Sequence, residues 1–186
     1  MYLFLDTETT GVPRSRSAPP EAVRHWPRLV QIAWAAHDES GSCLATETHL
    51  VCPMDFVIPA AAARIHGVST ARARSDGKPA GWVIERLLCA VAEHGRVLVG
   101  HNIAFDRNVV AAEMYRLGYP KETVEKGFYA TRQFCLMMNT ATFCGLPGRF
   151  GTPKYPTLAE LHSKLFGQEL HARHRADVSS GYGNWE

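Results

Sequence analysis

The chain opens with an apolar run that ends on two carboxylates. Leu3, Phe4 and Leu5 predict a strand buried on both faces, and Asp6 and Glu8 follow two residues apart. Alternate residues of a strand project to the same side, so the two carboxylates share one face. Buried together, their charges are unfavourable unless cations neutralise them, and oxygen ligands suit Mg²⁺ or Mn²⁺. The sequence therefore predicts a metal site here; the alternative is a strand end whose acids simply point into water.

Length and composition place the chain in a broad class. Its 186 residues are 46% hydrophobic and 20% charged, which is enough for one sizeable core and too short to favour two domains. We therefore expect a single α/β domain over residues 1–186. The formal net charge of +2 permits a nucleic-acid partner without requiring one.

Cysteine usage and hydropathy indicate the compartment. None of the five cysteines forms a CxxC pair, which argues against a disulfide framework and a zinc ribbon. No apolar stretch approaches the roughly 20 residues that span a bilayer, and the N-terminus lacks the pattern of a signal peptide. These features predict a cytoplasmic protein with reduced thiols and no contact with a membrane.

Periodicity predicts the order of the elements. Strand candidates at residues 29–37 and 43–51 form an antiparallel meander with the opening strand. Residues 11–28, rich in proline, arginine and serine, form a long loop between the first two strands. Further along, the pattern predicts helices over 59–66, 81–93 and 103–117, with a buried strand at 96–100. The buried stripe of the second helix is expected at Val83, Leu87, Leu88 and Val91.

A third carboxylate lies where packing alone would not place it. At 100° per residue, Asp106 falls on the side of its helix that carries Val109 and Val110, which should face the core. A charged group there needs a partner. We expect Asn102 to cap this helix, and the positive helix end to help keep Asp106 ionised.

A fourth carboxylate, Asp177, follows His171 and His174 near the C-terminus. Four carboxylates from separate segments can hold two divalent ions about 4 Å apart, an arrangement suited to phosphodiester hydrolysis. A nearby histidine would remove a proton from water. Taken alone, Asp177 would be a surface helix acid.

Three segments together resemble the signatures of the DEDDh family of 3′→5′ exonucleases, which includes the proofreading subunit of bacterial DNA polymerase. They are FLDTETTG, LVGHNIAFD and HARHRADV. The segments LVQIAW, ARIHGVS, FYATRQF and YPTLAELHSKLFG resemble connecting elements of the family in the expected order.

This resemblance implies a ribonuclease H-like α/β fold: a five-stranded mixed sheet, its first three strands antiparallel, flanked by helices. It also implies two Mg²⁺ or Mn²⁺ ions, and a histidine of the last segment as general base. The implied metal ligands are Asp6, Glu8, Asp106 and Asp177.

The last segment departs from the family pattern. Members usually place four residues between the histidine and the aspartate, whereas five separate His171 from Asp177 and two separate His174 from it. We favour His171, because one extra residue can bulge out of the preceding loop. His174 is the alternative, since it would share a helix face with Asp177.

The resemblance also suggests how substrate is held. Thr7, Thr9 and Thr10 would contact the terminal nucleotide, and Ile65 and His66 would close over its base; for Ile65 the alternative is core packing. Exposed arginines would contact phosphates or form only a solvated charged surface. These are Arg14, Arg16, Arg64, Arg72 and Arg74.

We therefore expect a 3′→5′ exonuclease acting on a single-stranded or frayed 3′ end, DNA favoured over RNA, and releasing nucleoside 5′-monophosphates. A polymerase or repair complex is the expected partner. The sequence leaves the oligomeric state open. The alternatives are a non-catalytic nucleic-acid-binding module on the same scaffold and a phosphodiesterase for small signalling dinucleotides.

Overall fold

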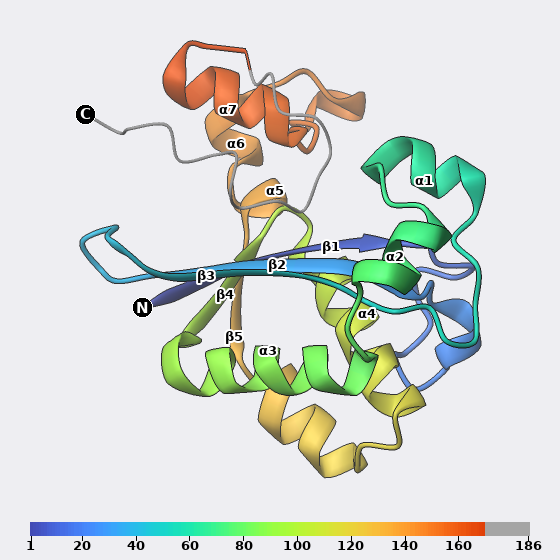
Figure 1. Ribbon diagram of the computed structural model, residues 1–186. Coiled ribbons are helices and arrows are strands. Elements are labelled where there is room, and N and C mark those ends of the chain that lie inside the picture. The colour runs from blue at the N-terminus through green and yellow to red at the C-terminus, as the bar shows by residue number, and fades with distance from the viewer. Residues whose placement is uncertain (170–186) are drawn as a thin grey trace.

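A five-stranded sheet organises the computed structural model, which describes residues 1–169. The strands lie in the order β3-β2-β1-β4-β5 (Figure 1). Their bounds are β1 (Tyr2–Thr9), β2 (Leu29–His37), β3 (Cys43–Leu50), β4 (Val97–Gly100) and β5 (Arg132–Cys135). Strands β1, β2 and β3 pair antiparallel, and β4 and β5 add parallel to β1. The predicted mixed sheet with an antiparallel first half is confirmed.

Strand β1 is buried on one face only, so the expectation of a strand buried on both faces is wrong. Leu3 and Leu5 are buried, whereas Phe4 keeps 39% of its surface exposed. Leu3 and Leu5 lie in the main core with the helices below the sheet, and Phe4 borders an open cavity. The apolar run misleads because Phe4 is apolar yet points to the open face.

Helices α3 (Ala80–His94) and α4 (Ile103–Arg116) cover the other face of the sheet, as Figure 1 shows. The bounds predicted for these helices, 81–93 and 103–117, are confirmed to within one residue at each end. In α3 the buried stripe is shifted: Ile84 and Ala90 are buried, whereas Leu88 and Val91 pack only against the edge of the core. The core therefore lies nearer Ile84 than the sequence pattern indicates.

Two short helices stand beside the end of the sheet where β1 finishes. The first, α1 (Ala60–His66), stops at Gly67, whose left-handed conformation (φ +76°) favours glycine. The second, α2 (Thr70–Asp76), begins at Ser69, whose side chain accepts a hydrogen bond from the Arg72 amide. Val30 of β2 packs with both helices in a small second core.

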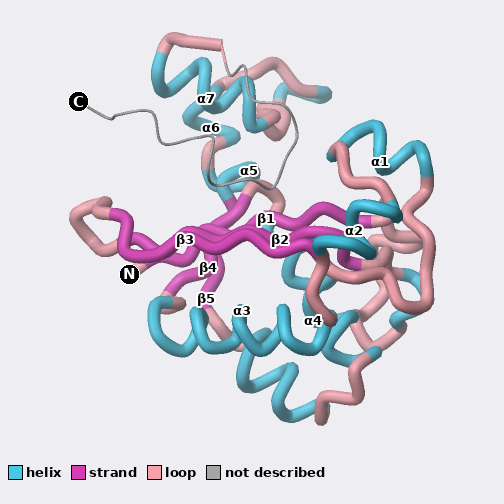
Figure 2. The backbone as a smooth tube through the Cα atoms, viewed as in Figure 1, coloured by secondary structure: helices cyan, strands magenta, loops and turns pink. Residues whose placement is uncertain are grey.

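The remaining helices stand on the opposite side of the sheet from α3 (Figure 2). They are α5 (Leu136–Asn139), α6 (Ala141–Cys144) and α7 (Leu158–Phe166). In α7 the Thr157 side chain accepts from the Glu160 amide while the Glu160 carboxylate accepts from the Thr157 amide. This reciprocal cap fixes where α7 begins.

Two 3-10 turns and one seven-residue π-helix occupy three of the connections. They are η1 (Val23–His25), η2 (Thr123–Tyr129) and η3 (Arg149–Gly151). The long loop before β2 is anchored to α4, because Arg116 donates hydrogen bonds to the backbone carbonyls of Val23, Trp26 and Pro27. No helix within residues 1–169 is long and apolar enough to cross a membrane.

Candidate active site

The two carboxylates of β1 lie on the face of the sheet turned away from α3 and α4. Asp6 is exposed and Glu8 is partly buried. Between them, Thr7 is buried on the opposite face. The register pairs Asp6 with Ala33 and Glu8 with Gln31, so a small and a neutral side chain stand beside the two acids on β2.

Asp106 reaches the same end of β1 from the first turn of α4. The side chain is only 4% exposed, and its Oδ1 accepts from the Thr7 amide at 3.0 Å and from the Thr7 hydroxyl at 2.7 Å. The end of β4 lies close to β1 and to the start of α4 because residue 100 is glycine. A Cβ there would lie 2.9 Å from the Leu5 carbonyl oxygen and 2.8 Å from Ile103 Cδ1. The predicted inward orientation of Asp106 is confirmed.

Asn102 does not cap α4 in the way expected. Its backbone is left-handed (φ +67°), and its side chain makes no capping hydrogen bond. Asparagine tolerates this conformation better than most residues. The residue therefore serves to turn the chain sharply from β4 into α4.

Burial, with the nearby Asp6 carboxylate as the second cause, raises the pKa of Asp106 to about 8. The hydrogen bonds from Thr7 oppose this shift without cancelling it. Any help that the positive helix end gives to the ionised form is therefore outweighed by burial and by Asp6. A divalent cation would supply the missing positive charge, so this oxygen-rich pair fits such an ion.

The predicted ligand set extends beyond the described residues. Among residues 1–169, no group of three or more His, Cys, Asp or Glu side chains is placed to hold a metal ion. Asp6 and Asp106 are brought together, and Glu8 follows on the Asp6 face of β1. The predicted fourth ligand, Asp177, and both candidate bases, His171 and His174, lie outside the described residues.

The threonines after Asp6 are engaged within the protein. Besides the bond from Thr7 to Asp106, the Thr9 hydroxyl donates to the Gly11 carbonyl at 2.6 Å. The Thr10 hydroxyl accepts from the Arg28 amide at 2.9 Å. These side chains shape the loop that leaves β1.

The two residues expected over a base differ in exposure. Ile65 is 64% exposed, which excludes the alternative of core packing. His66 is 3% exposed, and its Nδ1 accepts from the Val68 amide. Burial lowers the pKa of His66, and a hydrogen bond with the Thr9 backbone opposes this shift. The buried ring, at the last residue of α1, is therefore favoured in its neutral form.

A pocket of about 360 Å³ lies beside the first turns of α4, next to Phe105 and Asn108, and Asp106 itself does not line it. Its apolar walls include Val12 and Phe105, and the Phe105 ring lies 6.5 Å from that of Trp26. Sequence reasoning missed Phe105, although its position directly before Asp106 could have indicated it. The full lining is Val12, Pro13, Arg16, Trp26, Asn102, Ala104, Phe105 and Asn108.

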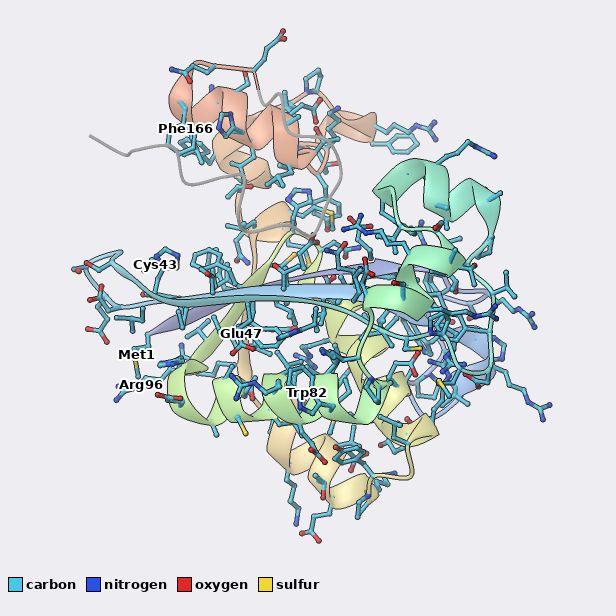
Figure 3. All side chains as sticks on the ribbon, viewed as in Figure 1. Met1, Cys43, Glu47, Trp82, Arg96 and Phe166 are labelled. Atoms are coloured by element: carbon cyan, nitrogen blue, oxygen red, sulfur yellow. The ribbon has the colours of Figure 1, made fainter. Side chains whose placement is uncertain are left out.

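A larger cavity, of about 680 Å³, lies away from these acids, over the first residues of β1, β4 and β5. Met1 and Arg96 line it and are labelled in Figure 3. Within residues 1–169, none of the predicted metal ligands and none of the residues expected at the terminal nucleotide lines either cavity. The smaller pocket is connected with Asp106 only through its neighbours on α4, Phe105 and Asn108.

The chain matches a known protein family. The protein-family model RNase_T, described as Exonuclease, matches residues 3–178. No curated protein matches the chain.

Among solved structures, Escherichia coli Exonuclease I in complex with a 5cy-dA13 oligonucleotide is similar at a TM-score of 0.68 and 21% identity. That match covers 95% of this chain and 37% of the other. Exonuclease I from Methylocaldum szegediense matches at a TM-score of 0.69 and 21% identity, over 95% and 38% of the two chains. The chain thus spans well under half of these proteins, and the likeness confirms the predicted ribonuclease H-like fold.

The family match covers nearly the whole chain and includes the segments that carry Asp6, Asp106 and Asp177. The chain therefore belongs to the RNase_T exonuclease family, a family of hydrolases, which confirms the DEDDh assignment made from its sequence.

Proposed function

We propose that this protein is a metal-dependent 3′→5′ exonuclease that acts on a single-stranded or frayed 3′ end, with DNA favoured over RNA. The products would be nucleoside 5′-monophosphates. The observation that carries the proposal is the buried Asp106 carboxyl, held by Thr7 and near enough to Asp6 to feel its charge, in a member of an exonuclease family. Structures of similar Exonuclease I chains contain dA13, dA16 and dT13 oligonucleotides, which supports single-stranded DNA as the substrate.

Asp6, Glu8, Asp106 and Asp177 would together hold two Mg²⁺ or Mn²⁺ ions. When bound, such ions lower the pKa of an attacking water and neutralise charge on the scissile phosphate. A zinc-bound form of the E. coli ExoI complex with single-stranded DNA supports a divalent metal ion in this protein. Thr7 contributes by fixing the Asp106 carboxyl through two hydrogen bonds.

The pocket beside the first turns of α4 would receive the terminal nucleotide. Val12 and Phe105 offer apolar surface to a base, which any base can contact without its edge being read. Exposed Ile65 would cover the base from α1. The loop after β1, shaped by Thr9 and Thr10, would present backbone groups to the sugar and phosphate.

The proposal extends to partners and compartment. All five cysteines lie within the described residues and are free, which fits the reducing cytoplasm. We expect a polymerase or repair complex as the partner. A similar Exonuclease I has been solved in an ExoI/SSB-Ct complex, which supports a partner involved with single-stranded DNA.

The direct test is release of mononucleotides from a 3′-labelled single-stranded DNA in Mg²⁺, Mn²⁺ or EDTA. We expect release that stops with EDTA and in Asp106→Asn, with Asp76→Asn on α2 as the matched control. An RNA of the same sequence should be cut more slowly. Tight binding without turnover would instead support the binding module, and faster cleavage of dinucleotides than of long strands would support the dinucleotide phosphodiesterase.

A further inference from the structure

The connection between α6 and α7 has an unusual composition. Residues 145–156 contain no acidic side chain, and they place a basic residue directly before an aromatic one twice. The pairs are Arg149–Phe150 and Lys154–Tyr155, and both aromatic side chains are exposed. Lys154 is ion-paired with Glu160 of α7 at 2.6 Å, which leaves Arg149 and Phe150 as the pair to consider. Positive charge next to an exposed ring is typical of surfaces that bind single-stranded nucleic acid.

The backbone of this connection is held in one shape. The Lys154 amide donates to the Leu146 carbonyl at 3.1 Å, and the Thr152 hydroxyl donates to the Arg149 carbonyl at 2.9 Å. At Gly148, a Cβ would lie 2.1 Å from the Thr152 carbonyl oxygen. The backbone at residue 148 can therefore pass this close to the backbone at Thr152 only because residue 148 is glycine. The tip of the connection is therefore displayed by a defined turn.

Phe150 stands at that tip under two unfavourable conditions. Its backbone is left-handed (φ +56°), a conformation that costs free energy for a bulky residue. Its side chain is fully exposed, so it gains nothing from burial against the described residues. A ring held in this way is available to stack on a flat partner.

The connection is tied to the candidate active site at its far end. The backbone carbonyl of Pro156 accepts a hydrogen bond from the His101 ring, and His101 directly precedes Asn102, which lines the pocket beside α4. The reciprocal cap at Thr157 and Glu160 then fixes the start of α7. Helices α5 to α7 stand over the sheet face that carries Asp6, as Figure 1 shows, so a strand leaving the site can pass this connection.

We propose that Phe150 stacks on a base of the single strand upstream of the scissile bond and that Arg149 contacts a backbone phosphate there. Both are positioning residues, and the inference rests on the proposed function. Stacking accepts any base, so this contact would favour strands of several nucleotides over mononucleotide esters without selecting a sequence.

The test compares two substrates in the full chain: a single-stranded DNA oligonucleotide, and the p-nitrophenyl ester of thymidine 5′-monophosphate, which has no upstream strand. Phe150→Ala should raise KM for the oligonucleotide roughly tenfold and leave the ester unaffected. Phe150→Trp should restore oligonucleotide KM. The matched control is Phe143→Ala, which removes another exposed ring, on α6.

Arg149→Gln should weaken the salt dependence of oligonucleotide binding. The slope of log K against log salt concentration should fall by about 0.7, because one phosphate contact is lost.

Binding in EDTA separates this inference from the proposed function. Anisotropy with oligonucleotides that carry one abasic residue, moved stepwise from the 3′ end, should show one sensitive position in the wild type and none in Phe150→Ala. Equal affinities of Phe150→Ala and Phe143→Ala would overturn the inference, as would a lower Tm in Phe150→Ala, which would show that the ring is covered by the protein itself. A wild type that cleaves neither substrate would defeat the proposed function, while the abasic series would still decide the role of Phe150.

Discussion

Asp106 is an acid whose ionisation is opposed by its surroundings. Its pKa in the folded protein is about 8 against an ordinary value of 3.8, so the metal-free fold binds this proton more tightly than the unfolded chain does. The stability that this group contributes is therefore complete below pH 4 and is lost as the pH rises towards 8. Asp106→Asn should match the wild type at pH 4 and exceed it at pH 8 by a few kcal/mol, on the order of 1.4 kcal/mol per pKa unit.

Urea unfolding in EDTA at several pH values measures this difference, with Asp76→Asn on the exposed face of α2 as the control. Added Mg²⁺ should raise wild-type stability at pH 8 and leave Asp106→Asn unchanged. Parallel pH profiles of the wild type and Asp106→Asn would contradict the account of this carboxyl.

The general base is a second question at the scale of single residues. Replacing the true base by alanine should lower kcat by roughly 10²-fold or more while metal affinity stays unchanged, because a proton acceptor does not ligate the ion. We expect this of His171→Ala, with His174→Ala nearer the wild type. Near-normal rates in both variants would exclude a histidine base from this segment.

Among the elements, α4 joins the site to the long loop before β2. Glu113 is 1% exposed, and its Oε1 accepts from Arg28 Nε and from the Leu29 amide, each at 2.9 Å. Arg116 lies 3.0 Å from the same oxygen. Glu113→Gln should destabilise the fold by roughly 3 kcal/mol, because two partly buried arginines lose their shared counter-charge.

Chemical denaturation measures that loss against Glu122→Gln, which removes an ion pair to Lys126 between exposed side chains. The surface variant should change stability by no more than about 0.5 kcal/mol. Similar costs in the two variants would show that the loop is not anchored through Glu113.

The elements also show what the sequence could and could not predict. The sequence predicted the bounds of α3 and α4 well, although only α3 is buried along one side and α4 is buried around most of its circumference between residues 106 and 114. Periodicity failed for the burial of Phe4, since an open sheet face leaves an apolar side chain exposed without changing the pattern. The role of Asn102 was missed because asparagine suits both a cap and a left-handed turn.

At the scale of the whole molecule, the family resemblance predicted a five-stranded mixed sheet with its first three strands antiparallel, and the structure confirms it. They also predicted that Asp6 and Asp106, one hundred residues apart in sequence, come together. The sequence could not reveal the Glu113 network or the exposed tip at Phe150, because both depend on which backbone segments happen to cross. The single domain over residues 1–186 and the roles of His171 and Asp177 stay predictions.

The central claim is that carboxylates from distant segments together bind two divalent cations. Isothermal titration of the full chain with Mn²⁺ tests it most directly. We predict uptake of two ions per protein, lost in Asp6→Asn and in Asp106→Asn and retained in Asp76→Asn. No uptake by the wild type, or the same uptake in all four proteins, would contradict the claim.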